Sequence, residues 1–257
     1  MVKTEKLLYS SDLSEVSLVE ENGKKYIAKM MKITKDVRVE QQIISYLSRE
    51  KDSDIYIQMY IGEKITNNKY QLLLAYLEGP TLYEYKYKKQ DILLIMYQTL
   101  KALNFIHKNE VIHGDIKLEN IIKDRDTFKF IDFGFSCFFD DQLCLLRKRG
   151  TLDYLSPEFP NKDDILNVKI KSDIWALGIV FYECYFGKLP FHGETLSEQI
   201  RKVRNDEPYF SNTIPKTEDY YIQKIIKDML IKDYERRPDT TNILNYFEEK
   251  FEILSPQ

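Results

Sequence analysis

The apolar pattern of this chain changes at Glu78-Gly79-Pro80, and this change constrains the fold more than any other feature. Before it, short runs rich in β-branched and aromatic residues predict four strands, at residues 15–21, 24–31, 55–64 and 70–77. Gly23 predicts a hairpin turn between the first two runs, and residues 37–50 repeat their apolar positions at helical spacing. The N-terminal part is therefore predicted to be a small sheet that carries one helix.

After the break, the apolar positions follow a helical period. The predicted helices are residues 91–108, 174–185, 220–231 and 240–251. The second of these is apolar all round, which is typical of a helix buried at the centre of a domain. We therefore expect one domain of the α+β class over residues 1–257, with a sheet-rich lobe at 1–77 joined by a hinge to a mainly helical lobe at 78–257.

The bulk properties describe an ordinary globular protein. A hydrophobic share of 43% can fill a core, and a formal net charge of -3 provides no basic field for nucleic acid. The N-terminus is polar and lacks a signal peptide, and the most apolar stretch, residues 174–186, is too short for the ~20 residues that span a bilayer. We expect an intracellular protein of the cytoplasm or nucleus, without a membrane or nucleic-acid partner.

The chain has three cysteines, Cys137, Cys144 and Cys184, and they form no CxxC pair or metal-ligand spacing. A small, odd number argues against a secreted domain that depends on disulfides. Cys137 and Cys144 lie in one segment and could report redox state, but isolated cysteines are usually inert. We therefore expect thiols without a role.

Two loops bounded by predicted strands carry carboxylates beside small or amide residues: HGDIKLEN, residues 113–120, and IDFG, residues 131–134. Phosphoryl transfer needs positioning and charge neutralisation more than covalent chemistry. One carboxylate must orient the attacking hydroxyl, and another must hold Mg²⁺ with an amide oxygen, while a cation lies near the phosphates. Asp115, Asp132, Asn120 and Lys117 supply these groups.

On these motifs, the chain resembles the eukaryotic protein kinase family over residues 8–251. The resemblance implies a two-lobed fold and ATP with Mg²⁺ as cofactors. It implies that Asp115 is the catalytic base or aligning residue and that Lys117 steadies the transferred phosphate. By the same resemblance, Asn120 and Asp132 bind the metal.

The nucleotide site is also implied by the resemblance. Lys29 matches the strand lysine that contacts the α- and β-phosphates, and Glu40 matches its helix partner. Leu74 matches the gatekeeper, and the backbone groups of Ala75 and Leu77 would hold adenine. The other implied nucleotide contacts are Leu8, Val16, Ala28 and Ile122.

The C-terminal motifs extend the resemblance. Ser156-Pro157-Glu158 stands where the family has Ala-Pro-Glu at the end of its activation segment, and Glu158 is expected to form a buried ion pair with Arg237. Asp173 matches an aspartate that braces the catalytic loop from a buried helix; the alternative makes it a helix N-cap. Lys117 and Thr151 are typical of serine/threonine kinases.

The glycine-rich phosphate loop of the family is not present. Its glycines would fall at Tyr9, Ser11 and Ser14 when the sequence is aligned on Val16. Glycine permits a close backbone approach and positive φ, so we expect weakened binding of ATP.

The usual arginine of the catalytic loop is also replaced, by Gly114. In many kinases this arginine pairs with a phosphorylated activation segment. Residues 137–150 contain no Ser, Thr or Tyr, so the receptor and the phosphate acceptor are missing together. We therefore expect an enzyme that is not switched by phosphorylation of this segment.

Two other functions stay open at this stage. One is a small-molecule kinase of the aminoglycoside or choline type, because HGD with an Asn five residues later also resembles those enzymes. The other is a pseudokinase, a scaffold with weak ATP binding, which the glycine-free loop favours. The preferred prediction is a serine/threonine protein kinase (a transferase) with unidentified protein substrates, acting as a monomer or under an unidentified protein regulator.

Overall fold

The N-terminal part folds as one five-stranded antiparallel sheet, in a computed structural model that describes residues 3–12, 14–32, 35–66, 69–147, 150–159, 164–211 and 215–252. The strands are β1 (Lys3–Ser10), β2 (Ser14–Glu21), β3 (Lys24–Lys32), β4 (Tyr60–Thr66) and β5 (Lys69–Ala75), in the order β1-β2-β3-β5-β4. Asn22 and Gly23 both have positive φ, which a two-residue turn with the twist of its strands requires. The predicted hairpin is therefore confirmed, between β2 and β3.

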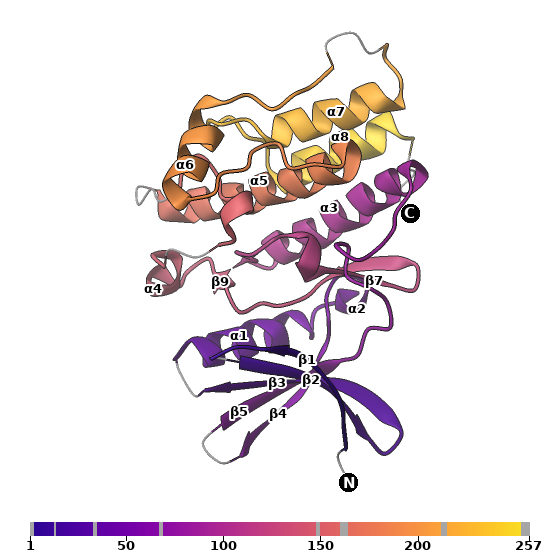
Figure 1. Cartoon of the computed structure of the whole chain (residues 1–257), viewed down its shortest axis with the longest axis vertical. Helices are drawn as coiled ribbons and strands as arrows, with labels where there is room; N and C mark the ends of the chain where they lie inside the picture. Colours follow the sequence, from indigo (N-terminus) through magenta and orange to yellow (C-terminus); the bar gives the residue numbers. More distant parts are fainter. Residues whose placement is uncertain are drawn as a thin grey trace.

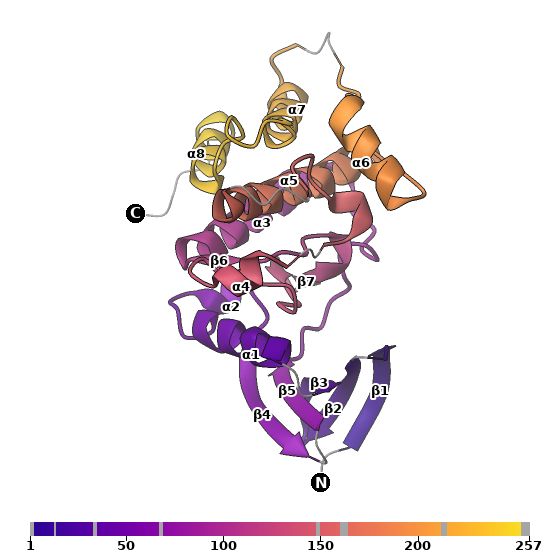
Figure 2. The ribbon, with the colours of Figure 1, turned by 90° about the vertical axis from the view of Figure 1, so that its left-hand side faces the viewer.

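Helix α1 (Lys35–Leu47) lies between the sheet and the rest of the molecule, as Figures 1 and 2 both show. Its residues Ile43, Ile44 and Leu47 are buried in the same core as Leu72 and Leu74 of β5. The spacing that predicted this helix is thus the spacing of the face that it buries.

Two predictions for this part were incomplete. Residues 55–64 begin as the short helix α2 (Ser53–Tyr56) and enter strand β4 only at Tyr60. In between, Ile57 forms a parallel bridge with Phe130, so a contact with the other lobe overrides the local β pattern. Strand β1 was not predicted, because Leu7, Leu8 and other side chains of this edge strand are exposed and show no alternation.

The C-terminal part is mainly helical and is built around α5 (Ile165–Phe186), in which residues 173–182 are all buried. The other helices are α3 (Ile92–Lys108), α4 (Gln142–Leu145), α6 (Leu196–Asn205), α7 (Glu218–Met229) and α8 (Thr240–Lys250). Two small antiparallel pairs lie on the side facing the sheet: β6 (Val111–Ile112) with β9 (Cys137–Phe138), and β7 (Ile121–Asp124) with β8 (Thr127–Phe130). The two-lobed α+β arrangement is confirmed.

The central helix starts earlier than the apolar pattern predicted, at Ile165 rather than at residue 174, because its first turns carry polar side chains. Helix α6 was missed, although the sequence marks its start. Thr195 caps it by accepting a hydrogen bond from the backbone N–H of Glu198, and Thr-x-x-Glu is a capping signature.

Cys137 and Cys144 form a disulfide, which corrects the expectation of isolated thiols. Strand β9 carries the first cysteine, and α4 returns the chain after a turn so that the second lies against it. The separation of seven residues matches no short cysteine motif, so the pairing depends on a turn that the pattern did not predict. Cys184 is a free, buried thiol on α5.

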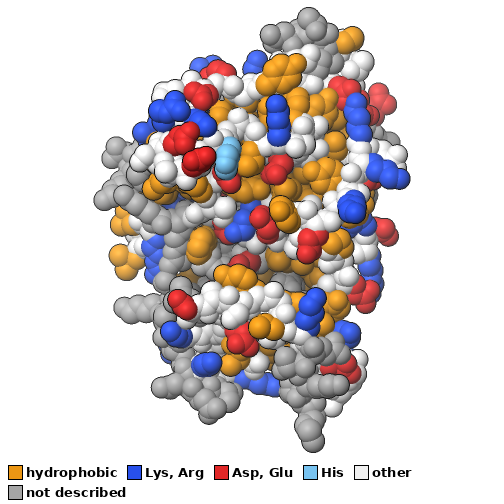
Figure 3. Space-filling model, in the orientation of Figure 1, with side chains coloured by type: hydrophobic (Ala, Val, Ile, Leu, Met, Phe, Trp, Pro, Cys, Tyr) orange, Lys and Arg blue, Asp and Glu red, His pale blue; other side chains and the backbone are white. Residues whose placement is uncertain are grey.

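Basic and acidic side chains are interspersed on the face shown in Figure 3, without a field of one sign. Within the described part of the chain, every helix is too short or too polar to cross a bilayer.

Candidate active site

The loop after β6 is held in place by a carboxylate that rises from the central helix. Asp173 accepts hydrogen bonds from the backbone N–H groups of His113 at 2.8 Å and of Gly114 at 2.9 Å. His107 of α3 brings its Nε2 to 3.0 Å from the same carboxylate. Asp173 lies well inside α5, so the N-cap alternative is wrong and the predicted brace is confirmed.

The imidazole of His113 anchors this loop to the next one. It lies between the rings of Phe130 and Phe133, and burial lowers its pKa below the ordinary value. The ring is therefore neutral. Its Nε2 lies 3.2 Å from the carbonyl oxygen of Ile131, and its Nδ1 accepts from the N–H of Asp115. One side chain thus links the backbones that carry the two predicted carboxylates.

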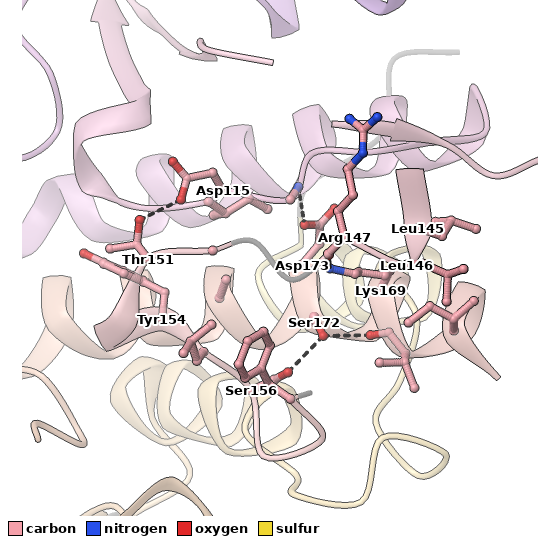
Figure 4. Close-up of a pocket in the computed structure, with 18 residues that line it drawn as sticks. Asp115, Leu145, Leu146, Arg147, Thr151, Tyr154, Ser156, Lys169, Ser172 and Asp173 are labelled. Atoms are coloured by element: carbon pink, nitrogen blue, oxygen red, sulfur yellow. Dashed lines mark hydrogen bonds between the residues drawn. The ribbon is translucent and has the colours of Figure 1, made fainter. Parts of the chain in front are cut away.

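The carboxylate of Asp115 is surrounded by three donors. Thr151 Oγ1 donates to Oδ1 at 2.6 Å, and Lys117 Nζ donates to Oδ2 at 2.7 Å (Figure 4 shows Asp115 facing Thr151). Asn120 Nδ2 donates to Oδ2 at 3.0 Å and to the carbonyl oxygen of the same residue at 2.8 Å. Lys117 also donates to Thr151, at 3.0 Å, so the network is closed. A carboxylate held in this way has a fixed direction.

A second charged group joins the sheet to the other loop. Lys29 Nζ donates to Glu40 Oε1 at 2.6 Å and to Asp132 Oδ1 at 2.8 Å. Burial disfavours the ammonium of Lys29, but the two carboxylates outweigh it and raise its pKa. Asp132 keeps 47% of its side chain exposed, and the charge and hydrogen bond of Lys29 lower the pKa of its carboxyl. At neutral pH, Lys29 and Asp132 are therefore a charged pair that joins the two lobes.

The backbone around Asp132 is shaped for this contact. Asp132 has a φ of 61°, a left-handed conformation that is uncommon outside glycine. The N–H of Gly134 donates to Asp132 Oδ1 at 3.2 Å. A Cβ at position 134 would lie 3.1 Å from that oxygen and 3.4 Å from Glu40, so glycine leaves room for the carboxylates.

Most predicted nucleotide contacts lie around the junction of the lobes. Ala28 and Leu74 are buried on neighbouring strands, and Val16 lies opposite Lys29 in the β2–β3 register. The chain then leaves the sheet through Leu77, which is buried. It docks on β7, where Ile122 bridges Thr81.

Two predicted contacts have unexpected surroundings. The backbone N–H of Ala75 donates to the carbonyl of Met59, and its own carbonyl accepts from Gln58 Nε2 at 2.8 Å. One lone pair of that carbonyl remains for a ligand. Leu8 is 46% exposed on the edge strand, the most exposed of the predicted nucleotide contacts.

The tip of the β1–β2 hairpin is tied by its serines. The N–H of Ser11 donates to the carbonyl of Ser14 at 2.8 Å, and Ser11 Oγ donates to the same carbonyl at 3.2 Å. The N–H of Ser14 in turn lies 3.1 Å from Ser11 Oγ. The hydroxyl and amide groups of this glycine-free tip therefore bond to one another.

The residues present fit Mg-ATP as a donor set. Asn120 has committed its amide nitrogen to Asp115, so Oδ1 is the atom left to act as a ligand beside the carboxylate of Asp132. Over the described residues, no group of three or more His, Cys, Asp or Glu side chains could hold a metal. Mg²⁺ usually takes one or two carboxylates together with substrate phosphates, which is the kind of site that this pair supports.

A cavity lies between the catalytic loop, the segment after α4 and helix α5 (Figure 4). Its lining includes Asp115, Thr151, Tyr154, Lys169 and Ser172, so it opens beside the carboxylate network. Ser172 of this lining donates to Glu158, which forms the predicted ion pair with Arg237; the pair is confirmed as buried.

Sequence reasoning missed three contributors: His107, Gln58 and Gly134. His107 and Gln58 act on partners far away in sequence, and Gly134 acts through the absence of a side chain. Only Gly134, as part of IDFG, carried a signal in the sequence.

Comparison with known proteins identifies the fold. The family model described as Protein kinase domain matches residues 6–247. Serine/threonine-protein kinase ppk16 of Schizosaccharomyces pombe is 30% identical over 197 residues, covering 72% of this chain and 28% of that protein. Calcium-dependent protein kinase 6 of Plasmodium berghei is 30% identical, covering 94% of this chain and 17% of that protein.

A third relative, myosin light chain kinase 2 of Bos taurus (skeletal/cardiac muscle), is 29% identical over 73% of this chain and 31% of its own length. The chain thus spans about a third or less of the length of each of these three relatives.

Proposed function

Because this chain belongs to the protein kinase family, we propose that it is a serine/threonine protein kinase that transfers the γ-phosphate of Mg-ATP to protein hydroxyls. The observation that carries the proposal is the closed network in which Thr151, Lys117 and Asn120 all donate to Asp115. These are the groups that would face an acceptor hydroxyl and a transferred phosphate.

In this mechanism, Asp115 accepts a hydrogen bond from the substrate hydroxyl, orients its oxygen and takes its proton as the bond to phosphorus forms. Thr151 and Lys117 fix the direction of the carboxylate, and the ammonium of Lys117 would offset negative charge on the transferred group. Asn120 and Asp132 would hold Mg²⁺, which, when bound, neutralises phosphate charge.

Lys29 would hold the α- and β-phosphates, while Glu40 fixes the position of its ammonium. The apolar residues Ala28, Leu74 and Ile122 would enclose the adenine, together with Val16 and Leu77. The self-bonded tip at Ser11 and Ser14 offers fewer backbone donors to phosphate, so we expect ATP affinity to be low for a kinase.

Phosphorylation of the activation segment is not part of this mechanism. Gly114 has a φ of +80°, and a Cβ there would lie 2.5 Å from the carbonyl oxygen of Phe135. The position therefore suits glycine and supplies no cation to a phosphate. Treatment with a phosphatase is expected to leave the rate unchanged.

The pseudokinase alternative is favoured by the glycine-free tip, and it predicts nucleotide binding without turnover. The small-molecule kinase alternative has less support, because the chain carries the Glu158–Arg237 pair and the Asp173 brace. A cytoplasmic or nuclear location, a monomeric state and the absence of nucleic-acid partners stay predictions from composition.

The deciding experiment follows transfer of label from γ-labelled ATP to generic protein substrates, with and without Mg²⁺. Asp115→Asn is expected to lower kcat by about 10²–10⁴-fold, the range of a general base. Asp132→Asn should transfer no label, whether or not Mg²⁺ is added. Asp126→Asn, an exposed aspartate in the β7–β8 turn, is the matched control and should keep full activity.

Equal signals from the parent protein and from Asp132→Asn would reject the proposal and favour a scaffold. Transfer to an aminoglycoside or to choline, without transfer to protein, would instead favour the small-molecule alternative.

A further inference from the structure

The disulfide between Cys137 and Cys144 lies in the segment between the two predicted catalytic loops and Glu158. It joins strand β9 to helix α4 across the turn at Phe139–Asp141. Both cysteines are buried, with 5% and 1% of their surfaces exposed. The stabilisation of a whole protein by a disulfide is smallest for short loops, so this bond acts mainly on its own segment.

This disulfide forms a small core of its own with Ile112 and Leu145. Val39 of α1 and Ile170 of α5 pack against it, partly buried. Three parts of the candidate active site therefore meet here. Ile112 directly precedes the catalytic loop, Val39 precedes Glu40, and α5 carries the bracing Asp173.

Helix α4 depends on these contacts for its position. It has only four residues, and a helix this short is not stable by itself in water. Asp141 caps it by accepting from the N–H of Cys144, and Lys169 of α5 donates to the carbonyl of Arg147 just beyond it. Leu143 is 77% exposed, so one side of the helix faces solvent. The covalent bond is the strongest tie between α4 and the β6–β9 pair.

We propose that the Cys137–Cys144 disulfide is a redox latch that keeps residues 137–147 of the activation segment in the arrangement described above, and that its reduction lowers phosphoryl transfer. The activity part of this inference rests on the proposed function. The latch stands where other regulated segments are ordered by a phosphate paired with arginine. Here residues 137–150 have no hydroxyl side chain, and Gly114 supplies no arginine.

The chemistry balances with a dithiol reductant. One of its thiolates attacks a sulfur of the disulfide, and the S–S bond breaks as a mixed disulfide forms. The second thiolate of the reductant then closes its own disulfide and releases the other cysteine. The protein gains two electrons and two protons as two thiols, and the reductant loses them. Burial of both sulfurs requires local opening of α4 first, so reduction should be slow under native conditions.

The first measurement counts thiols. The protein, prepared with an oxidant or with dithiothreitol, is denatured and alkylated, and its mass is determined. The oxidised parent should expose one thiol, from Cys184, and the reduced parent three. The rate of label transfer from ATP to a generic protein substrate is measured on the same samples, as is the rate of tryptic cleavage at Arg147. We expect reduction to lower transfer at least fivefold, to speed cleavage, and to be reversed by reoxidation.

Variants separate the latch from a general effect of thiols. Cys137→Ser and Cys144→Ser should show the low rate and fast cleavage of the reduced parent and should not respond to reductant. Cys184→Ser, which changes a buried thiol outside the segment, is the matched control and should respond like the parent. The comparison of the oxidised with the reduced parent needs no variant, so the test still decides if either cysteine variant fails to fold.

Three thiols in the oxidised parent would mean that the disulfide does not form, and this would overturn the proposal. Equal rates of tryptic cleavage in the oxidised and the reduced parent would overturn it as well. Equal transfer by both forms would overturn its regulatory role. If the oxidised parent transfers no phosphate at all, the proposed function fails instead, and the cleavage comparison still decides whether the disulfide orders the segment.

Discussion

Arg237 and Glu158, 79 positions apart in sequence, form a two-pronged ion pair that is closed off from solvent, with nitrogen–oxygen distances of 2.8 and 3.1 Å. The guanidinium also donates to the carbonyl of Ile231 and lies 5.0 Å from the ring centroid of Trp175. The pair therefore joins the end of the activation segment to the centre of the helical lobe. Each of the three nitrogens of the guanidinium donates to at least one acceptor, which is the condition under which a buried charge is tolerated.

Removing this arginine should destabilise the whole lobe. Arg237→Met leaves the buried carboxylate of Glu158 without a cation, with only the hydroxyl of Ser172 still donating to it. We therefore expect the free energy of unfolding in urea to fall by about 3–5 kcal/mol. Lys202→Met is the control: it removes a half-exposed pair with Glu198 on α6 and a hydrogen bond to the carbonyl of His192, and it should cost at most about 1 kcal/mol. A loss for Arg237→Met as small as that of the control would contradict the structural role.

The ammonium of Lys29 should matter for activity more than for folding. Lys29→Met removes the charge that joins Glu40 to Asp132 and that would contact phosphate, so kcat/KM is expected to fall by about 10²–10³-fold. Steady-state kinetics at saturating Mg²⁺ measure this effect. Lys64→Met, which removes an exposed lysine on β4, is the matched control and should keep the parental value. A loss in both variants would point to a change in the sheet.

The sequence predicted the features that depend on local pattern. Asn22-Gly23 marked the β2–β3 turn, and the apolar spacing of Ile43, Ile44 and Leu47 marked α1. The pairing of residues far apart in sequence, such as Glu158 with Arg237, was predicted from the family resemblance. No periodicity links Glu158 to Arg237, but their motifs have fixed roles in the family.

What the sequence did not predict depends on tertiary context. The residues before β4 leave the strand because Ile57 pairs with Phe130 in the other lobe. Cys137 and Cys144 meet because β9 pairs with β6 and the chain turns back through α4. The hydrogen bond from the hydroxyl of Ser11 to the carbonyl of Ser14 likewise forms only in the folded hairpin, so the sequence did not predict it.

Gly114 should be intolerant of any side chain, for two separate reasons. Gly114→Ala meets the strain of a φ of +80°, about 1–2 kcal/mol, and a contact of 2.5 Å with the carbonyl oxygen of Phe135. Gly23→Ala meets similar strain at a φ of +75° but has no atom within 4 Å of its Cβ. Urea unfolding should therefore show a larger loss for Gly114→Ala, and equal losses would mean that the contact relaxes freely. Restoring arginine, as Gly114→Arg, should destabilise the protein without making activity depend on phosphorylation.

The buried imidazole of His113 should make the protein less stable in mild acid. Burial lowers its pKa, so the native state keeps the ring neutral, whereas the unfolded chain binds a proton near pH ~6.5. Because the unfolded state binds more protons below that pH, the free energy of unfolding falls as the pH falls. The contribution of this one group approaches about 1.4 kcal/mol per pH unit.

His113→Phe removes this titration while keeping a ring between Phe130 and Phe133. Urea unfolding at about pH 7.5 and about pH 5 should show a smaller difference between the two pH values for this variant than for the parent. His192→Phe, at an exposed histidine, should leave the parental difference unchanged. If His113→Phe and the parent lose the same free energy on acidification, the ring is not held neutral by the fold. The link from His113 to the backbones of Ile131 and Asp115 would then have to tolerate a charged imidazole.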